Sequence, residues 1–283
     1  MRTGVIDFHT HPYRPQDLAP GTREWAAGVS PAIREHGDRL LEPAYAADLL
    51  RAQGVERAVV LPEHCPATSG NVRTEAVLAH CAAAPDFYVP FACVDPNTDR
   101  HPERLLRAYA GMGPIRGLKL YPSYQFFHPN ERRIYPIYEV CVELGIPLLL
   151  HIGSSVLPNT RLEYCDPIHL VDVAVDFPEL QIVMAHGGRG FWYDRCAFLA
   201  AHHANVHIDV TGLVPSRLLE HFPRMTELAD KFIFGSDWPA MPKSVAANVS
   251  AIEALGLPAD ALDRILRRNA SRLLRLDGDA ADA

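Results

Sequence analysis

The run Ile146-Pro147-Leu148-Leu149-Leu150-His151 decides the fold, because it is apolar throughout until it ends on a histidine. A strand without alternating polar residues is buried on both faces, which is typical of a parallel sheet covered by helices. A helical pattern over 132–144 precedes the run, and Gly145 closes that helix. The run over 182–185 is equally apolar. These stretches predict parallel strands that alternate with helices.

The same order of strand and helix repeats along the chain. Strands are predicted at 5–11, 55–61, 87–94, 115–121, 146–150, 180–185, 206–210 and 231–234. Helices are predicted at 45–52, 72–84, 102–109, 132–144, 167–177, 191–203, 215–229, 245–255 and 259–274. Eight such units in 283 residues favour an α/β fold of the closed (β/α)8 type, the TIM barrel, over an open doubly wound sheet. We expect a single domain over 1–283, with helices at its C-terminal end.

A long loop is predicted after the first strand, over 12–42. This segment carries Trp25, several prolines and several charges. One interpretation is an excursion on the surface, and the other is a lid over the mouth of the barrel. The sequence leaves these two alternatives open.

The composition narrows the class of partner. The net charge is -7 and there is no basic run, which argues against nucleic acid as a partner. No apolar segment approaches the roughly 20 residues of a membrane span, so we expect no membrane partner. The six cysteines are scattered without a CxxC pair, and no signal pattern precedes Val5. We therefore expect free thiols, a cytoplasmic location and a small-molecule substrate, with a homo-oligomer left open.

The ends of the predicted strands carry the chemistry, because active groups of such barrels lie at the C-terminal ends of the strands. His9 and His11 stand two residues apart, so both imidazoles can point to one side of an extended chain. His151, His186 and Asp237 follow the apolar runs of later strands. Each residue alone is more often structural. Metal-type ligands at four strand ends together predict a metal site at the barrel mouth.

Five motifs resemble the amidohydrolase superfamily, and most closely its amidohydrolase 2 branch. They are Asp7-Phe8-His9-Thr10-His11, Gly117-Leu118-Lys119-Leu120-Tyr121-Pro122, Leu150-His151, Ala185-His186-Gly187-Gly188 and Phe234-Gly235-Ser236-Asp237-Trp238-Pro239. This branch holds small metal-dependent TIM-barrel proteins, among them lactone hydrolases and decarboxylases related to aminocarboxymuconate semialdehyde decarboxylase. The resemblance implies the same fold and a divalent metal as cofactor.

Carried over to this chain, the resemblance implies a metal held by His9, His11, His151 and Asp237. His186 would be a ligand of a second metal or a general acid/base. Asp237 would also accept the proton of metal-activated water. Zinc suits this ligand set best, as one or two ions, with manganese or iron as alternatives.

Lys119 is the ambiguous member of this set. In two-metal relatives of the superfamily, the lysine at this strand end is carboxylated and bridges the ions, so Lys119 is both a metal-ligand and a catalytic candidate together with Asp237 and His186. A salt bridge to Glu63 or Asp95, or a contact with a substrate carboxylate, is the alternative.

The substrate-binding candidates are Tyr121, Tyr124, Arg189 and Trp238, which follow the fourth, sixth and eighth strands. Aromatic walls with few polar groups suit a small, partly planar organic substrate. Arg189 can bind a carboxylate through two parallel hydrogen bonds. Local packing or loop hydrogen bonding is the alternative for each residue.

Three functions are weighed. The first is a metal-dependent hydrolase that opens a lactone, amide or similar carbonyl compound through metal-activated water, which Lys119 favours. The second is a metal-dependent, non-oxidative decarboxylase of a small unsaturated or aromatic acid, whose carboxylate would lie near Arg189. The third is a non-catalytic metal-binding barrel. It is disfavoured because a complete set of metal ligands would then be present without a catalytic use.

Overall fold

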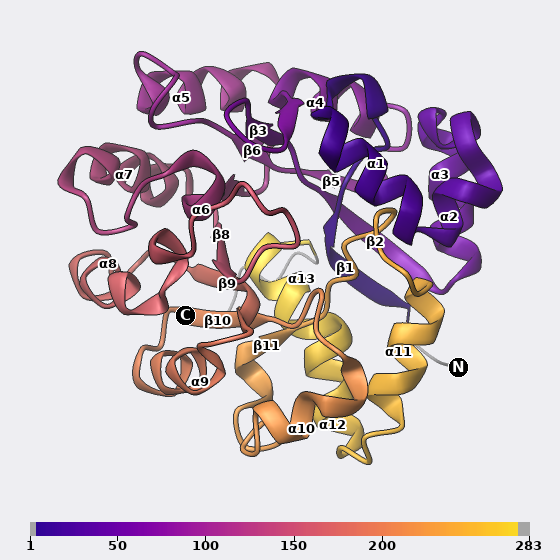
Figure 1. Cartoon of the computed structure of the whole chain (residues 1–283). Coiled ribbons are helices and arrows are strands. Elements are labelled where there is room, and N and C mark those ends of the chain that lie inside the picture. The colour runs from indigo at the N-terminus through magenta and orange to yellow at the C-terminus, as the bar shows by residue number, and fades with distance from the viewer. Residues whose placement is uncertain (1–3, 277–283) are drawn as a thin grey trace.

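The computed structural model describes residues 4–276, in which parallel strands close into a barrel (Figure 1). The strands are β1 Val5–Thr10, β2 Val55–Val60, β5 Tyr88–Pro90, β6 Ala92–Cys93, β7 Leu118–Leu120, β8 Leu148–Gly153, β9 Ile182–Arg189, β10 Val206–Asp209 and β11 Phe232–Ile233. Pairing runs β1-β2-β5 and β6-β7-β8-β9-β10-β11. Because β5 and β6 are one strand interrupted at Phe91, the order around the barrel has eight positions. The predicted TIM barrel is confirmed.

The seam between β1 and β11 closes the barrel. Phe8 donates its backbone N–H to the carbonyl of Phe234 at 3.0 Å, and His11 donates to the carbonyl of Trp238 at 2.8 Å. In the other direction, Asp237 donates to the carbonyl of His9 at 2.8 Å. The first and last strands are thereby joined at the end of the barrel where their polar residues lie.

Both faces of the strands are buried, as the apolar runs predict. In β8, Leu149 packs inside the barrel against residues such as Phe8 and Phe91. Its neighbours Leu148 and Leu150 point outward into the layer between strands and helices. Successive side chains of a strand alternate between its two faces, so a run of leucines fills both layers.

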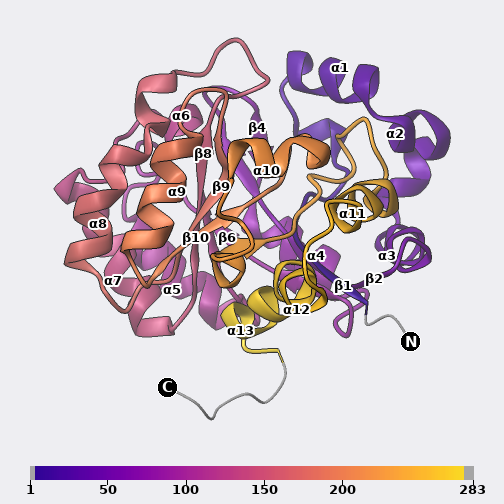
Figure 2. The same cartoon turned by 90° about the horizontal axis from the view of Figure 1, so that it is seen from below.

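Helices cover the outside of the barrel between successive strands (Figure 2). They are α3 Pro43–Ala52, α4 Thr74–Cys81, α5 Pro102–Met112, α7 Tyr135–Leu144, α8 Leu170–Asp176, α9 Tyr193–His202, α10 Leu218–His221 and α11 Val245–Glu253, whereas the one-turn helix α6 Pro122–Gln125 is buried directly after β7. Short helical turns lie between them: η3 Arg132–Ile134, η4 Leu162–Cys165, η5 Pro167–His169, η6 Pro215–Arg217 and η7 Ala229–Lys231. Within residues 4–276, no helix is both long and apolar enough to cross a membrane. The six cysteines are buried and free, as predicted.

The chain ends in α12 Ala259–Asp263, the π-helical turn η8 Arg264–Arg268 and α13 Asn269–Leu274. Ala270, Leu273 and Leu274 of α13 join the cluster inside the barrel. Figure 2 places α13 at the opposite end of the barrel from α1 Pro20–Val29. The C-terminal helix therefore plugs the end of the barrel that faces away from the predicted site.

The prediction of a long irregular loop over 12–42 is wrong. The segment folds into η1 Pro15–Asp17, α1, α2 Pro31–His36 and η2 Gly37–Leu41. Proline is favoured at the first position of a helix, where its missing N–H would have no partner and its fixed φ suits the helix. Pro15, Pro20 and Pro31, which indicated a loop, therefore begin η1, α1 and α2 instead.

Two further differences from the prediction have a clear cause. The helix predicted from residue 72 begins at Thr74, because β4 Gly70–Val72 pairs antiparallel with β3 Glu63–Cys65 in a small hairpin. The helix predicted over 215–229 is reduced to η6 and α10. Pro223 lies two residues past the end of α10, and proline cannot continue a helix interior.

Candidate metal centre and active site

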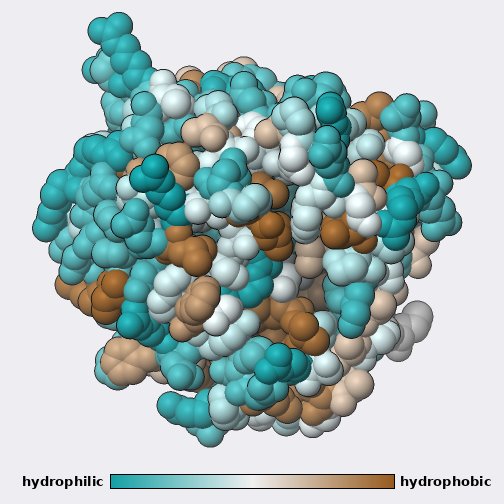
Figure 3. All heavy atoms as spheres, in the orientation of Figure 1, coloured by the Kyte–Doolittle hydropathy of each residue, from teal (hydrophilic) through white to brown (hydrophobic). Residues whose placement is uncertain are grey.

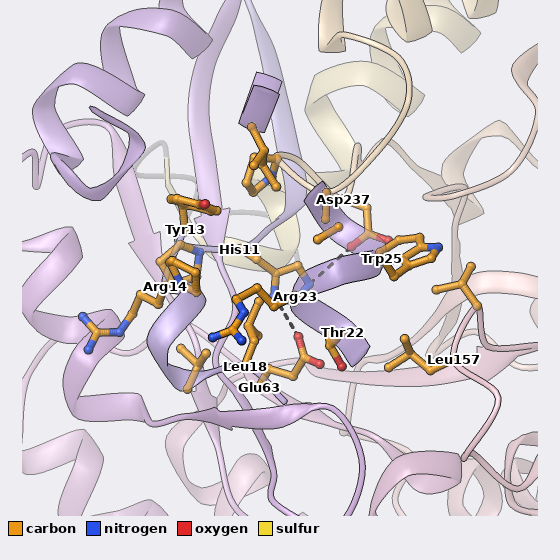
Figure 4. A pocket seen from close by; sticks show the side chains of 18 of the residues that line it. His11, Tyr13, Arg14, Leu18, Thr22, Arg23, Trp25, Glu63, Leu157 and Asp237 are labelled. Carbon is orange, nitrogen blue, oxygen red and sulfur yellow. Dashed lines mark ion pairs between the residues drawn. The ribbon is translucent and has the colours of Figure 1, made fainter. Parts of the chain in front are cut away.

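Two imidazoles and a carboxylate meet at the barrel seam. His9 lies on β1 and His11 lies one residue past its end. Both imidazoles point to the same side of the chain, as their spacing predicts. The Nε2 atom of His9 lies 3.5 Å from Asp237 Oδ1, and the Nε2 atom of His11 lies 3.3 Å from the same oxygen. Figure 4 shows His11 directed at Asp237. Three of the predicted ligands are thus brought to one point.

Two more imidazoles arrive from β8 and β9. His151 and His186 approach each other with 3.1 Å between His151 Nδ1 and His186 Nε2. The ring centroids of His9 and His186 are 5.1 Å apart. Ligand atoms of His9, His186 and Asp237 lie within 4.8 Å of one another, close enough to share a metal ion. The mouth of the barrel therefore collects all five predicted imidazole and carboxylate ligands.

The backbone at two of these residues is unusual. His186 has φ 66° and Asp237 has φ 63°, both in the left-handed region that non-glycine residues rarely adopt. Such conformations cost free energy and cluster at active sites and ligand clamps. Gly187 and Gly188, which follow His186, also have positive φ and allow the tight turn there.

Hydrogen bonds to the far ring nitrogens leave the near nitrogens free to bind. His9 Nδ1 lies 2.6 Å from Asp209 Oδ2, and His186 Nδ1 donates to the carbonyl of Thr211 at 3.0 Å. Burial lowers the pKa of His9, His151 and His186 below the usual value, so these imidazoles are neutral at neutral pH. Neutral imidazoles held in this way are the form that binds metals.

Asp237 supplies the negative charge of the site. Burial works to raise the pKa of its carboxyl group, but His9 and His11 outweigh that effect and hold the pKa well below its usual range. The carboxylate is therefore ionised at neutral pH and can act as a ligand or as a proton acceptor.

Lys119 lies on β7, fully buried at the base of this group. Burial lowers the pKa of its amine to about 8. The Nζ atom is 4.7 Å from the centre of the Tyr121 ring and has no hydrogen-bond partner among the described residues. The salt bridge to Glu63 or Asp95, one of the alternatives for Lys119, is not formed.

The donor set fits a divalent metal ion. Apart from Lys119 Nζ, the buried Nε2 atom of His151 also lacks a partner within residues 4–276. Buried polar atoms without partners are costly, and these two lie among converging imidazole and carboxylate groups. Nitrogen and oxygen donors of this kind suit zinc, manganese or iron.

A cavity opens above these residues, and the segment 12–42 forms one wall of it. We call this segment, with α1 and α2, the lid. Tyr13, Arg14, Leu18, Arg23 and Trp25 of the lid line the cavity (Figure 4). Of the two alternatives left open by the sequence, the lining of the cavity favours the lid.

Three of the four predicted substrate-binding residues line this cavity. Tyr121 and Tyr124 are buried in its wall, where the Tyr124 hydroxyl lies 2.7 Å from Ser155 Oγ. Arg189 is half-buried, and its Nε donates to the carbonyl of Ser154 at 3.1 Å. In the described part of the chain, no carboxylate forms an ion pair with Arg189.

Trp238 does not line the cavity. Its indole is 7% exposed and packs in the hydrophobic layer between the barrel and its helices. Only its backbone serves the site, through the carbonyl that accepts from His11. The prediction that Trp238 contacts the substrate is therefore not supported by its position.

Several residues of the site have roles that the sequence did not predict. Glu63 lines the cavity with its Oε2 atom 4.0 Å from His11 Nδ1, and Asp209 holds His9. Glu63 lies just past the predicted strand 55–61 and Asp209 near the end of the predicted strand 206–210, so the strand ends indicate their place at the mouth but not these contacts. The lining residues of the lid, such as Arg23 and Trp25, had no comparable signal because their helices were not predicted.

Comparisons with known proteins agree with this geometry. A family model described as amidohydrolase matches residues 6–276, which confirms the resemblance found in the sequence. No curated protein matches the chain.

Several solved structures share the fold. An uncharacterised TIM-barrel protein from Bordetella bronchiseptica is 25% identical, with a TM-score of 0.79 over 96% of this chain and 98% of that one. A 2,6-dihydroxybenzoate decarboxylase from Rhizobium is 18% identical, with a TM-score of 0.69 over 98% and 100%. A dihydroxybenzoic acid decarboxylase from Polaromonas sp. JS666, solved with manganese and 2-nitroresorcinol, is 17% identical, with a TM-score of 0.72 over 98% of each chain.

Proposed function

The chain belongs to the amidohydrolase family, and from this premise we propose that it is a metal-dependent, non-oxidative decarboxylase of a small aromatic or unsaturated carboxylic acid. The observation that carries the proposal is the position of Arg189. Its guanidinium lines the cavity and lies close enough to His151 and His186 to lower their pKa values. A cation held in place by Ser154, without a carboxylate of the described chain to neutralise it, suits the carboxylate of a substrate.

Further support comes from the relatives in structure and from the cavity wall. The dihydroxybenzoate decarboxylases named above act on small aromatic acids and share the fold at low identity. Tyr121 and Tyr124 present buried aromatic surface in the wall of the cavity, which suits a planar ring. This proposal reverses the order of the two enzymatic functions expected from the sequence, in which hydrolysis came first.

We assign the metal to His9, His11, His151 and Asp237, with His186 as an additional ligand or as a general acid/base. Bound there, a divalent ion would supply positive charge that stabilises negative charge developing on the substrate. The sequence favoured zinc, and the manganese in the Polaromonas structure makes manganese an equal candidate.

The residues of the chain have separate tasks in the proposed reaction. Arg189 binds the carboxylate, and the aromatic wall orients the ring beside it. The bond between the ring carbon and the carboxylate carbon breaks, carbon dioxide leaves, and a proton takes its place on the ring carbon. We assign to Asp237, which lies beside the proposed metal ligands, the transfer of that proton from solvent to the ring carbon.

The test is the product. Purified protein loaded with manganese or zinc is given a panel of hydroxybenzoates and a panel of lactones, and carbon dioxide release and ring opening are measured separately. We expect carbon dioxide from at least one acid. Arg189→Gln should lower kcat/KM about 10- to 100-fold, the range for a lost hydrogen bond to a charged group. The matched control is Arg217→Gln, because Arg217 is an exposed arginine that does not line the cavity.

The proposal is wrong if the metal-loaded protein opens lactones and releases no carbon dioxide from any acid. An equal loss of activity in the Arg189→Gln and Arg217→Gln variants would instead remove Arg189 from the assignment.

Hydrolysis remains the second candidate, and Lys119 is the observation that favours it. An amine with its pKa lowered to about 8 is partly unprotonated at neutral pH and can attack carbon dioxide, forming a carbamate and releasing a proton. We expect this carboxylation only in protein that holds two metal ions. Elemental analysis and intact mass under native conditions check both properties. Two ions with the added mass of one carbon dioxide support the hydrolase, whereas one ion beside an unmodified lysine counts against it.

A further inference from the structure

A second cavity adjoins the one above the candidate metal centre. We call the first the inner cavity and the second the outer cavity. The outer cavity is lined by Trp25, Val29, Ser154, Ser155, Val156, Arg189, Gly212, Met241 and Pro242. Trp25, Val156 and Arg189 line both cavities. The two spaces therefore meet along a border made by these three side chains.

The outer cavity is largely apolar. Trp25 and Val29 come from the lid helix α1, and Met241 and Pro242 from the chain after β11. Val156 remains 45% exposed although it is aliphatic. Figure 3 shows hydrophobic side chains gathered around a hollow on the face that Figure 1 presents to the viewer. Exposed apolar surface beside a binding site is typical of a place where ligand is buried.

Two polar groups of the outer cavity, the Ser155 hydroxyl and the Ser154 carbonyl, are already engaged. The Ser155 hydroxyl pairs with the Tyr124 hydroxyl and accepts from the backbone N–H of Leu157 at 2.8 Å. The Ser154 carbonyl accepts from Arg189. The outer cavity therefore offers a ligand mainly apolar contact. The Arg189 cation lies where the outer cavity meets the inner one.

The position of Arg189 determines which part of a ligand can reach each of the two cavities. A carboxylate held by Arg189 lies where the inner and outer cavities meet. A substituent that reaches the outer cavity must then branch from the substrate close to that carboxylate, because a substituent on the far side of the ring points into the inner cavity.

We infer that the outer cavity is a subsite for an apolar substituent next to the carboxylate of the substrate. The substrate class is thereby narrowed to aromatic acids that carry an alkyl group in the position ortho to the carboxylate. This inference rests on the proposed function for the placement of the carboxylate at Arg189.

The test is a comparison of isomers by calorimetric binding to manganese-loaded protein. The probes are 2-hydroxybenzoate, 2-hydroxy-6-propylbenzoate and 2-hydroxy-4-propylbenzoate. Each buried methylene improves binding about fourfold, at ordinary values for apolar transfer. We expect the 6-propyl acid to bind at least tenfold more tightly than 2-hydroxybenzoate, and the 4-propyl acid to show no such gain.

Variants locate the gain in the outer cavity. Val29 and Met241 line the outer cavity and not the inner one. The double variant Val29→Ser with Met241→Ser should reduce the affinity ratio of the 6-propyl acid to the parent acid to less than threefold. Phe198→Ser is the matched control, because Phe198 is an exposed apolar residue of α9 outside both cavities. Circular dichroism verifies that each variant is folded.

The outcomes separate this inference from the proposed function. Equal binding of the two propyl isomers, or an unchanged ratio in the folded double variant, overturns the subsite. The binding measurement does not require turnover, so a preference for the 6-propyl acid in a protein that releases no carbon dioxide supports the subsite and rejects only the decarboxylase. Carbon dioxide release without that preference rejects only the subsite.

Discussion

The two histidines of β1 are held in different ways. Each turns Nε2 toward Asp237, but Nδ1 of His9 lies 2.6 Å from Asp209, whereas Nδ1 of His11 lies 4.0 Å from Glu63. His9 is therefore oriented by the protein itself. His11 has no such firm partner, and its position depends more on what it binds.

Removing a proposed ligand should remove the metal. We expect His11→Ala and Asp237→Ala each to lower the metal retained after dialysis at least tenfold, because a ligand contributes more than an outer partner, whose loss already costs about 10- to 100-fold in affinity. Elemental analysis of the dialysed proteins measures this. His202→Ala, on the exposed face of α9, should retain metal like the unchanged protein. Full metal content in both ligand variants would disprove the site.

His207 makes stability depend on pH at the other end of the barrel. Burial lowers its pKa to about 3, with Lys231 and Arg272 adding to the effect, and its Nε2 lies 3.0 Å from Gln181 Oε1. Between pH 3 and the ordinary value of 6.5, the unfolded chain binds a proton that the folded chain does not. The free energy of unfolding therefore falls as the pH is lowered through this window.

The His207→Gln variant should lose part of this dependence. We expect its free energy of unfolding to change less steeply with pH between 3 and 6.5, by up to about 1.4 kcal/mol per pH unit. Urea unfolding at several pH values in this window measures both slopes. Parallel slopes for the two proteins would show that His207 does not titrate on unfolding.

For single residues, the sequence predicts which residues lie at strand ends better than it predicts where their side chains point. His9, His11, His151, His186 and Asp237 were found because apolar runs place them at strand ends, and a barrel brings such ends together. Trp238 stands beside Asp237 in the sequence, yet its indole packs away from the cavity. The left-handed backbone at Asp237 sets these directions, and no pattern of residue types reveals it.

Among the elements, the helices of the lid are the ones that were not predicted from the sequence. Prolines at 20 and 31 and glycines at 21, 28 and 37 resembled loop residues. In the structure the two prolines occupy the first turns of α1 and α2. The barrel helices were easier to predict because they alternate with apolar strand runs in a repeated order.

Ser30 fastens the lid to the barrel. This buried side chain accepts from the backbone N–H of Ile33 at 3.0 Å, capping α2, and donates to the carbonyl of Pro239 at 2.5 Å. Pro239 lies two residues past Asp237. One hydroxyl thus joins the lid to the loop that carries a proposed ligand.

Ser30→Ala should loosen the lid without unfolding the barrel. The lost cap costs about 1 kcal/mol, and the carbonyl of Pro239 also loses its partner. We expect faster hydrogen exchange over 20–41 and unchanged exchange in β8 and β9, measured by mass spectrometry. Ser244→Ala removes the cap of α11, which accepts from Ala247 at 3.2 Å, and should leave the lid unchanged. Equal exchange of the lid in both variants would contradict the role of Ser30.

For the whole molecule, α13 holds the lower end of the barrel through Asn269. Its side-chain amide donates to the carbonyls of Ala229 at 2.7 Å and Phe232 at 2.8 Å, in a buried setting. Removal of the amide leaves two buried carbonyls without their partner, and each unsatisfied group costs about 1–3 kcal/mol.

Asn269→Ala should therefore lower the thermal midpoint of unfolding clearly, while the folded fraction keeps its metal, because the amide lies at the end opposite the site. Calorimetry and elemental analysis measure the two effects. Asn130→Ala is the control, because that side chain bonds an exposed Asp172 and its loss should shift the midpoint little. A matching shift in both variants would show that Asn269 has no special part in holding the barrel.

The overall architecture was readable because its strands are buried on both faces. Runs such as 148–150 exclude a half-exposed sheet, and eight repeats leave few ways to cover so many buried strands. The hairpin of β3 and β4 and the shortened α10 were not readable, because pairing of three-residue strands and the stop at Pro223 depend on local contacts.

The seam between β1 and β11 determines when the proposed site can form during synthesis and folding. Asp7 on β1 accepts hydrogen bonds from the backbone and the hydroxyl of Ser236, a residue 229 positions later in the chain. The two residues of this contact are far apart in the sequence. The proposed ligands His9 and Asp237 lie close to it, one on each of the two chain segments. Contacts so remote along the chain form late, because the loop between them must first be ordered. A growing chain therefore cannot bring the proposed ligands together until its last strand is made, and we expect metal uptake to report that the barrel has closed.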